Sequence, residues 1–160
     1  MAWTAPKTDF APGDILNAAQ MNAIGDNLVE LSPFFAAWTS YTPTLTQSGA
    51  VAKTVTYAEY VQIGNFVWVQ VSLTATGAGT GNNAITVTLP FAASSTAGVS
   101  GAAFVLDANV NSYVGTARGV TTTTVAFFQN QGGGTAIGQS PNFALANTDI
   151  VQFSAFYEAA

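Results

Sequence analysis

The sequence contains no histidine and no cysteine, and its only basic residues are Lys7, Lys53 and Arg118. Without histidine, a serine or threonine nucleophile has no imidazole to act as its base. Without cysteine, the chain has no thiolate nucleophile, no thiolate metal site and no disulfide framework. We therefore expect a protein that is not an enzyme and that uses no cofactor.

The sequence lacks the features that nucleic-acid binding, membrane insertion and secretion require. The formal net charge is -5 over 160 residues, whereas a surface that binds nucleic acid needs clustered Lys and Arg to neutralise phosphates. No apolar run reaches the roughly 18 residues of a membrane helix, and residues 1–10 lack the cationic and apolar regions of a secretory signal. We expect no nucleic-acid partner, no membrane partner, and synthesis in a cytoplasm.

The scarcity of charge also concerns the surface of the protein. Charged residues make up 7% of the chain, against about 25% of a typical soluble domain, and the mean hydropathy is +0.32. Many of the few charged residues lie in the first forty residues or near the C-terminus. The neutral remainder predicts a surface that another copy of the chain, or another protein, covers.

The first forty residues differ in character from the rest. Pro6, Pro12 and Gly13 disfavour a helix near the start of the chain, so residues 3–13 are expected to form an extended arm along a partner surface. The candidate docking residues are the apolar side chains of this segment: Trp3, Phe10, Ile15 and Leu16.

One helix is predicted, over residues 18–31. Asn17 suits its N-cap, Gln20 stands three positions later as the capping-box partner, and Pro33 ends it. The apolar positions of this helix form a narrow stripe at spacings of 3, 4 and 3: Met21, Ile24, Leu28 and Leu31. Either this stripe packs on the helix's own domain, or it forms a short parallel bundle between subunits.

From Tyr41 onward the apolar period changes to 2, which is typical of strands. The segments that fit this pattern are 41–46, 54–63, 66–76, 84–89, 101–106, 113–118, 121–128 and 149–157. Clusters of Gly, Asn, Ser and Pro separate them, and no helical pattern interrupts them. We therefore predict a mainly β fold: an antiparallel, jelly-roll-like β-sandwich over residues 41–160, preceded in residues 1–40 by an extended arm and one short α-helix.

Residues 54–76 are predicted to form a hairpin around a two-residue turn at 64–65. Its register pairs Glu59 with Gln70, Tyr60 with Val69, Val61 with Trp68, and Ile63 with Phe66. Both faces are apolar near the turn, so one makes the core and the other is a candidate subunit interface: Val61, Ile63, Phe66 and Trp68. The alternative is that a loop or the N-terminal helix covers this second face.

Two motifs match binding loops only in part. Residues 77–81 (GAGTG) are rich in glycine, as phosphate loops are, but neither a helix nor a lysine follows, so a hairpin loop is expected. The segment 107–111 (DANVN) has the oxygen spacing that opens a calcium loop, yet Ser112 and Arg118 stand where such a loop needs Gly and Glu. A polar hairpin loop and no metal site are expected there.

Carboxylates and aromatic rings are the remaining candidates for chemistry. A glycoside hydrolase needs two acids about 5 to 9.5 Å apart, and only Glu59 is flanked by strand aromatics, Tyr57 and Tyr60. A lone strand glutamate is more typical of an edge or interface charge than of catalysis. Tyr113 and the loops at the ends of the sandwich are candidates for stacking on sugar rings.

Several sequence blocks of this chain resemble, in the same order, blocks found in other proteins. After an N-terminal W-T-x-P, they are 13–22 (GDILNAAQMN), 41–46 (YTPTLT), 60–65 (YVQIGN), 85–90 (ITVTLP) and 153–158 (FSAFYE). In these blocks the chain resembles virion structural proteins of tailed bacteriophages, of the minor tail, short fibre or head-decoration type. The resemblance covers nearly the whole chain.

The resemblance implies a homotrimeric component of the virion that is assembled in the host cytoplasm. It implies that the arm and helix dock on a capsid or tail, that the β-domain faces outward, and that there are no catalytic residues. The chain has no internal repeat of the kind that forms a fibre shaft, which favours a compact knob. The alternative function is a receptor-binding module whose partner is a host-surface carbohydrate.

Overall fold

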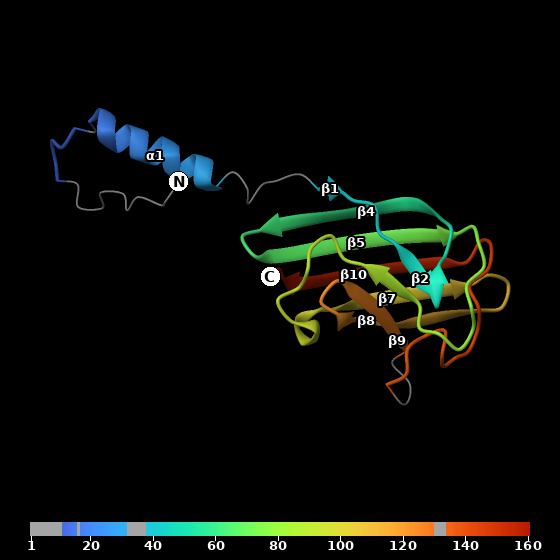
Figure 1. Cartoon of the computed structure of the whole chain (residues 1–160). Helices are drawn as coiled ribbons and strands as arrows, with labels where there is room; N and C mark the ends of the chain where they lie inside the picture. Colours follow the sequence, from blue (N-terminus) through green and yellow to red (C-terminus); the bar gives the residue numbers. More distant parts are fainter. Residues whose placement is uncertain (1–10, 16, 32–37, 130–133) are drawn as a thin grey trace. The chain divides into compact units, whose positions relative to one another are not determined.

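The computed structural model describes residues 11–15, 17–31, 38–129 and 134–160 of the chain (Figure 1). The chain divides into two compact units, residues 1–37 and residues 38–160. The first unit contains the helix α1, and the second contains the sheet.

Helix α1 spans Ala18–Leu31, as predicted. The backbone N–H of Asn17 donates to Gln20 Oε1, and the backbone N–H of Gln20 donates to Asn17 Oδ1, each over 2.9 Å. This reciprocal pair is the capping box expected from the sequence, and it satisfies two backbone donors that a helix start otherwise leaves without partners. Two side chains of the same segment therefore define where α1 begins.

The second unit is mainly β, with ten strands in its described residues. Their bounds are Thr39–Ser40 (β1), Leu45–Gln47 (β2), Gly49–Ala50 (β3), Lys53–Ile63 (β4), Phe66–Ala75 (β5), Thr86–Thr88 (β6), Ser100–Asp107 (β7), Asn111–Thr121 (β8), Thr124–Gln129 (β9) and Ile150–Glu158 (β10). A short 3₁₀ helix, η2, covers Thr96–Gly98. The mainly β class is confirmed.

All ten strands belong to one antiparallel sheet, in the order β1-β4-β5-β10-β7-β8-β9-β6-β2-β3. The last strand, β10, is hydrogen-bonded between β5 and β7. A sandwich consists of two separate sheets packed face to face, whereas hydrogen bonds join these strands in one continuous order. The jelly-roll-like sandwich therefore stays a prediction.

The sheet is curled into a half-barrel, and its short connections explain why. A flat sheet of ten strands would be about 43 Å wide at a strand spacing of about 4.8 Å. The strands β1 and β2 lie near opposite ends of the order, yet only residues 41–44 join them, and such a link spans at most about 18 Å. The two ends of the sheet therefore approach each other, and Figure 1 shows β2 and β9 crossing the direction of β4, β5 and β10.

Tyr41 connects the two ends of the curled sheet directly. Its backbone N–H donates to the carbonyl of Ala58 on β4 over 2.9 Å. Its hydroxyl donates to the carbonyl of Thr88 on β6 over 3.2 Å. Tyr41 thus links β4, near one end of the strand order, to β6, near the other end.

The core lies inside the curl. Alternate residues of β5 point inward and are 0% exposed: Val67, Val69, Val71 and Leu73. Leu45 of β2 and Val87 of β6 belong to the same buried cluster, and the rings of Phe127 and Phe153 lie 5.7 Å apart. Burial of these aliphatic and aromatic side chains is the main stabilising contribution to the fold.

The β4–β5 hairpin has the predicted register. Gly64 has a φ of 58°, the left-handed conformation that a tight two-residue turn requires. The observed pairs are Glu59 with Gln70, Tyr60 with Val69, Val61 with Trp68, and Ile63 with Phe66. Because the valines of β5 face the core, Phe66 and Trp68 face away from it.

Some segments differ from what the sequence predicts. Thr39 and Ser40, expected in the N-terminal segment, pair with β4 and are part of the sheet. Residues 77–81 were expected to close a hairpin, which is wrong, because β5 and β6 are not neighbours in the sheet. The position of that loop is set by contacts distant in sequence, since the Gly79 N–H donates to the carbonyl of Leu145 over 2.7 Å.

Candidate functional site

The outer face is the surface of β4, β5, β10 and β7 that points away from the core. The pairing registers place its residues in rows across these strands: Val61, Trp68, Phe156 and Ser100 in the first, Glu59, Gln70, Ser154 and Ala102 in the second, and Tyr57, Ser72, Gln152 and Phe104 in the third. The first row is mainly apolar, and the second and third carry carboxamides and hydroxyls. The outer face therefore has two parts with different chemistry.

The first part, the apolar patch, lies at the turn end of the β4–β5 hairpin. It consists of Trp38, Val61, Ile63, Phe66, Trp68 and Phe156. Phe66 is 49%, Trp68 43% and Phe156 53% exposed. Contiguous exposed apolar side chains of this kind usually mark a surface that binds another molecule. The candidate interface residues from the sequence therefore lie together in one patch.

Contacts inside the apolar patch hold its rings in place without covering them. The Trp38 ring meets the Trp68 ring edge-on, with centroids 5.1 Å apart, and the Phe66 and Phe156 rings stack at 6.5 Å. The indole N–H of Trp68 donates to Ser154 Oγ over 2.9 Å. The indole group thus has its hydrogen bond within the sheet, and its ring stays available for apolar contact.

The sequence analysis missed Trp38 and Phe156 as members of this patch. The period-2 pattern of β10 does place Phe156 on the same face as Ser154 and Gln152. It does not show that β10 pairs with β5, and this pairing is what puts Phe156 beside Trp68.

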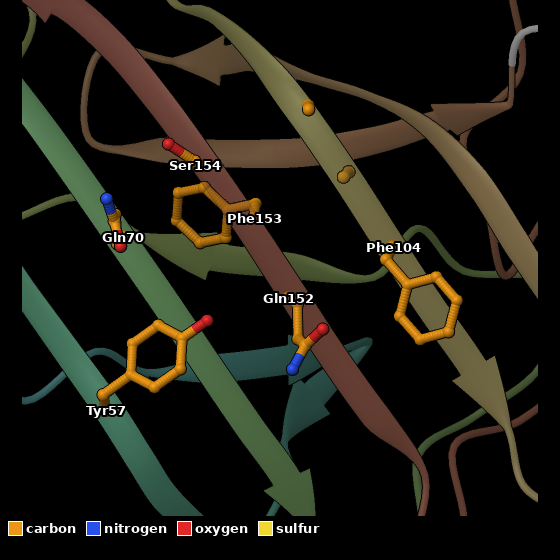
Figure 2. Close-up of a pocket in the computed structure, with 8 residues that line it drawn as sticks. Tyr57, Gln70, Phe104, Gln152, Phe153 and Ser154 are labelled. Carbon is orange, nitrogen blue, oxygen red and sulfur yellow. The ribbon is translucent and has the colours of Figure 1, made fainter.

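The second part, the polar pocket, is a shallow depression of about 220 Å³ in the outer face. Its lining is Tyr57, Gln70, Ala102, Ala103, Phe104, Gln152, Phe153 and Ser154. Figure 2 shows the Tyr57 ring reaching from β4 across β5 toward Gln152, with Phe104 on the other side of Gln152. No lining residue carries a charge, so the pocket presents aromatic rings and neutral polar groups.

Some hydrogen-bonding groups of the pocket have no partner among the described residues. The Gln152 Nε2–H donates to Ser72 Oγ over 3.0 Å, which leaves the Gln152 Oε1 without a bond among the described residues. The carboxamide of Gln70 also has no hydrogen bond in the described part of the chain. Ser154 accepts from Trp68, so its own O–H is available to donate. Both donors and acceptors therefore face the pocket.

The apolar stripe of α1 is exposed in the first unit. Met21, Ile24 and Leu28 are all exposed, and so is Ile15 of the predicted docking residues. Trp3, Phe10, Leu16 and the side chain of Leu31 lie outside the described residues. Packing of the stripe on its own domain and a bundle between subunits both stay predictions.

The buried carboxylate in the β unit has a structural role. Asp149 is 1% exposed, and its two oxygens accept the backbone N–H groups of Ala108 and Ala146, each over 2.8 Å. It thereby fixes the turn after β7 to the loop before β10. Burial, together with the nearby Asp149, raises the pKa of Asp107 above its usual range.

The expected polar loop between β7 and β8 is confirmed as a hairpin turn. Asp107 pairs with Asn111, and the Val110 N–H donates to the carbonyl of Asp107 over 3.0 Å. Within the described ranges, no three His, Cys, Asp or Glu side chains gather where they could hold a metal ion. Glu59 faces Ser40 on β1 and Gln70 on β5, so no carboxylate pairs with it in either neighbouring strand.

Tyr113, a candidate for stacking on sugar, is not available for that role. It is 7% exposed, and its ring stacks on Phe143 with centroids 5.3 Å apart. The expectation is wrong because β8 places Tyr113 on the core face, opposite Val105 of β7. The aromatic rings that line the polar pocket are Tyr57 and Phe104 instead.

Comparisons with known protein families, with curated proteins and with solved structures find no significant match to this chain. The resemblance of the sequence blocks to phage virion proteins therefore stays a prediction. Among the described residues, no helix is both long and apolar enough to cross a bilayer.

Proposed function

We propose that the chain is a non-enzymatic structural component of a tailed-phage virion, a homotrimeric decoration or short tail or fibre protein. Its N-terminal segment attaches to the particle, and its β-domain, in which the two halves of the curled sheet pack in a jelly-roll-like manner, faces outward. The observation that carries the proposal is the apolar patch, because contiguous exposed aromatic rings are typical of a surface that binds another protein.

The occupant proposed for the apolar patch is a second copy of the chain. The six residues of the patch are uncharged, so three copies of it meet around a three-fold axis without desolvating a charge at the centre. Glu158, which pairs with Phe66 on the same face, stays at the rim of this contact. Closed three-fold symmetry removes apolar surface of this patch from water, whereas a single copy leaves Phe66, Trp68 and Phe156 about half exposed.

The energetics favour the patch acting together with α1. Full burial of a Phe side chain is worth about 1.5–3 kcal/mol, so covering the exposed halves of Phe66, Trp68 and Phe156 contributes about 3 kcal/mol. Association costs about 4–15 kcal/mol of lost translational and rotational freedom. The exposed stripe of Met21, Ile24 and Leu28 supplies a second apolar surface, and two linked weak contacts reinforce each other.

Analytical ultracentrifugation of the full chain tests the proposal. At micromolar concentration the protein is expected to sediment as a trimer, and Trp68→Glu or Phe156→Glu is expected to shift it toward monomer by burying a charge in the interface. Val110→Glu is the matched control, because Val110 is exposed in the β7–β8 turn outside the patch. A wild-type protein that sediments as a monomer would contradict the proposal.

A second function, carbohydrate binding to a host surface, is favoured by a separate observation. The polar pocket combines two aromatic rings with uncharged hydrogen-bonding groups, and this combination is complementary to sugars, which have apolar C–H faces and many hydroxyls. This second function is compatible with the first, since the pocket and the apolar patch occupy different rows of the outer face.

A further inference from the structure

We propose that the polar pocket binds an uncharged glycan, which lies between the Tyr57 and Phe104 rings and is held by the carboxamides of Gln70 and Gln152. This inference rests on the second function, carbohydrate binding, and assigns it to a sheet surface. The sequence had suggested the loops at the ends of the β-domain.

The pocket has the form of a trough with aromatic walls. Tyr57 on β4 and Phe104 on β7 are three strand spacings apart, about 14 Å, and β5 and β10 form the floor between them (Figure 2). The floor residues between the two rings are Ser72 on β5 and Gln152 on β10, and Figure 2 shows the Gln152 side chain standing between Tyr57 and Phe104. A sugar ring therefore lies over the Gln152 carboxamide, with an aromatic ring on either side.

The size of the trough suits a small ligand. Its volume of about 220 Å³ is below the range of about 300–1,000 Å³ that is typical of sites for drug-sized molecules. One sugar ring matches this volume, and further rings of a longer glycan extend along the outer face. Tyr57 is 42% exposed, so the face of its ring is accessible to a C–H face of the sugar.

The hydrogen-bonding groups of the trough match sugar hydroxyls, each of which both donates and accepts. Gln70 offers a complete carboxamide, with two N–H donors and a carbonyl oxygen, that has no bond in the described part of the chain. Gln152 is held in place by its bond to Ser72 and presents its Oε1 as an acceptor. Because Gln152 is already oriented, less rotamer entropy is lost on binding.

The charges around the trough favour a neutral ligand. None of its lining residues is charged, and Glu59 lies beside Gln70 in the second row. The β unit carries four carboxylates against Lys53 and Arg118. Arg118 lies on β8, beyond Ala102, and its guanidinium donates to Thr116. No cation lines the trough to offset the desolvation of a sialylated or uronic-acid glycan. Uncharged hexose or N-acetylhexosamine chains meet no such penalty.

The test begins with the full-length protein on an array of neutral and anionic oligosaccharides, followed by titration calorimetry with the neutral oligosaccharide that binds most strongly. Gln70→Ala and Tyr57→Ala are each expected to weaken that binding by about 3- to 10-fold, the effect of losing one neutral hydrogen bond or one ring contact. Gln70→Ala is the sharper variant, because Gln70 bonds to no other described group and its loss leaves the fold intact.

Gln139→Ala is the matched control, since Gln139 is an exposed carboxamide in a loop away from the trough. It is expected to bind like the wild type, and ultracentrifugation is expected to give the same oligomer for all variants. Neutral-glycan binding that Gln70→Ala and Tyr57→Ala leave unchanged would overturn this site while keeping carbohydrate binding. Binding of anionic glycans alone would overturn the proposed ligand class, and no binding on the array would overturn both the site and the second function.

Discussion

At the scale of single residues, buried polar side chains hold the loops of the β unit to its core. Gln47 is 1% exposed, and its Nε2–H groups donate to the carbonyls of Phe143 and Asn83 while its Oε1 accepts the N–H of Leu145. One side chain thus satisfies three backbone groups that would otherwise be buried without partners.

Tyr157 has a similar role at the other end of the unit. Its hydroxyl donates to the carbonyl of Phe91 over 3.1 Å and accepts the Phe91 N–H over 3.3 Å. Burial raises the pKa of Tyr157 to about 12 from an ordinary value of 10.0. Burial also raises the pKa of Tyr41, with the nearby Tyr157 as a second cause.

The raised tyrosine pKa values predict a loss of stability at alkaline pH. Between pH 10 and about 12 the unfolded chain loses the Tyr157 proton while the folded chain keeps it, so the free energy of unfolding falls as the pH rises through this window. Below pH 10 the contribution is complete. Urea unfolding measured at each pH unit from 8 to 12 gives this slope.

Tyr157→Phe is expected to be less stable at pH 8 by about 1 kcal/mol, because the Phe91 backbone groups lose their partner. Its stability is also expected to fall less steeply above pH 10. Tyr57→Phe is the control, since Tyr57 is exposed and has no bond to Phe91. Equal slopes in the wild type and in Tyr157→Phe would contradict the assignment.

At the scale of elements, glycines mark where strands turn and where they approach closely. Gly64 has positive φ in the β4–β5 turn, with open space around it. Gly101 on β7 lies directly against β10, so that an added Cβ would collide with the Ser154 carbonyl and the Ala155 backbone. Gly64 is therefore required for the backbone conformation of the turn, and Gly101 for the close packing of β7 against β10.

Substitution of each of these two glycines by alanine is therefore expected to lower the stability of the fold by different amounts. Gly64→Ala costs about 1–2 kcal/mol, because an alanine in the left-handed conformation is strained. Gly101→Ala costs at least about 3 kcal/mol or prevents folding, because backbone atoms of β10 cannot move aside. Urea unfolding gives both values, with Gly49→Ala as a near-neutral control in open space. A larger cost at Gly64 than at Gly101 would be inconsistent with the observed packing.

At the scale of the whole molecule, the two units have different expected tasks. The β unit contains every described strand, and its core consists of residues from that unit alone. Unit 1–37 contains α1 with its exposed apolar stripe. Folding is therefore a property of the second unit, and docking is the proposed property of the first.

Deletion of residues 1–31 is expected to leave the β unit folded, with a thermal midpoint within a few degrees of that of the full chain, because no core side chain is lost. If the proposed virion role holds, the truncated chain is expected to lose binding to phage particles that lack this protein, as measured by co-sedimentation. The full chain is the positive control. Binding that survives the deletion would contradict docking through the N-terminal segment.

The features that sequence alone determined are local. The capping box joins residues three positions apart, and the β4–β5 register follows from a two-residue turn, so both depend only on neighbouring residues. The period-2 pattern likewise marked most strands, and it placed Phe66 and Trp68 on the face opposite Val67 and Val69.

The composition of the outer face was decided only by the tertiary structure. Trp68 and Ser154 are 86 residues apart and share a hydrogen bond, and Tyr57 and Phe104 form one trough only because β10 inserts between β5 and β7. No local pattern encodes which strands pair, since pairing depends on burying the whole core at once while the short links close the sheet. The sequence thus determined that neutral strands with exposed aromatics exist, and the fold decided which of them form one surface.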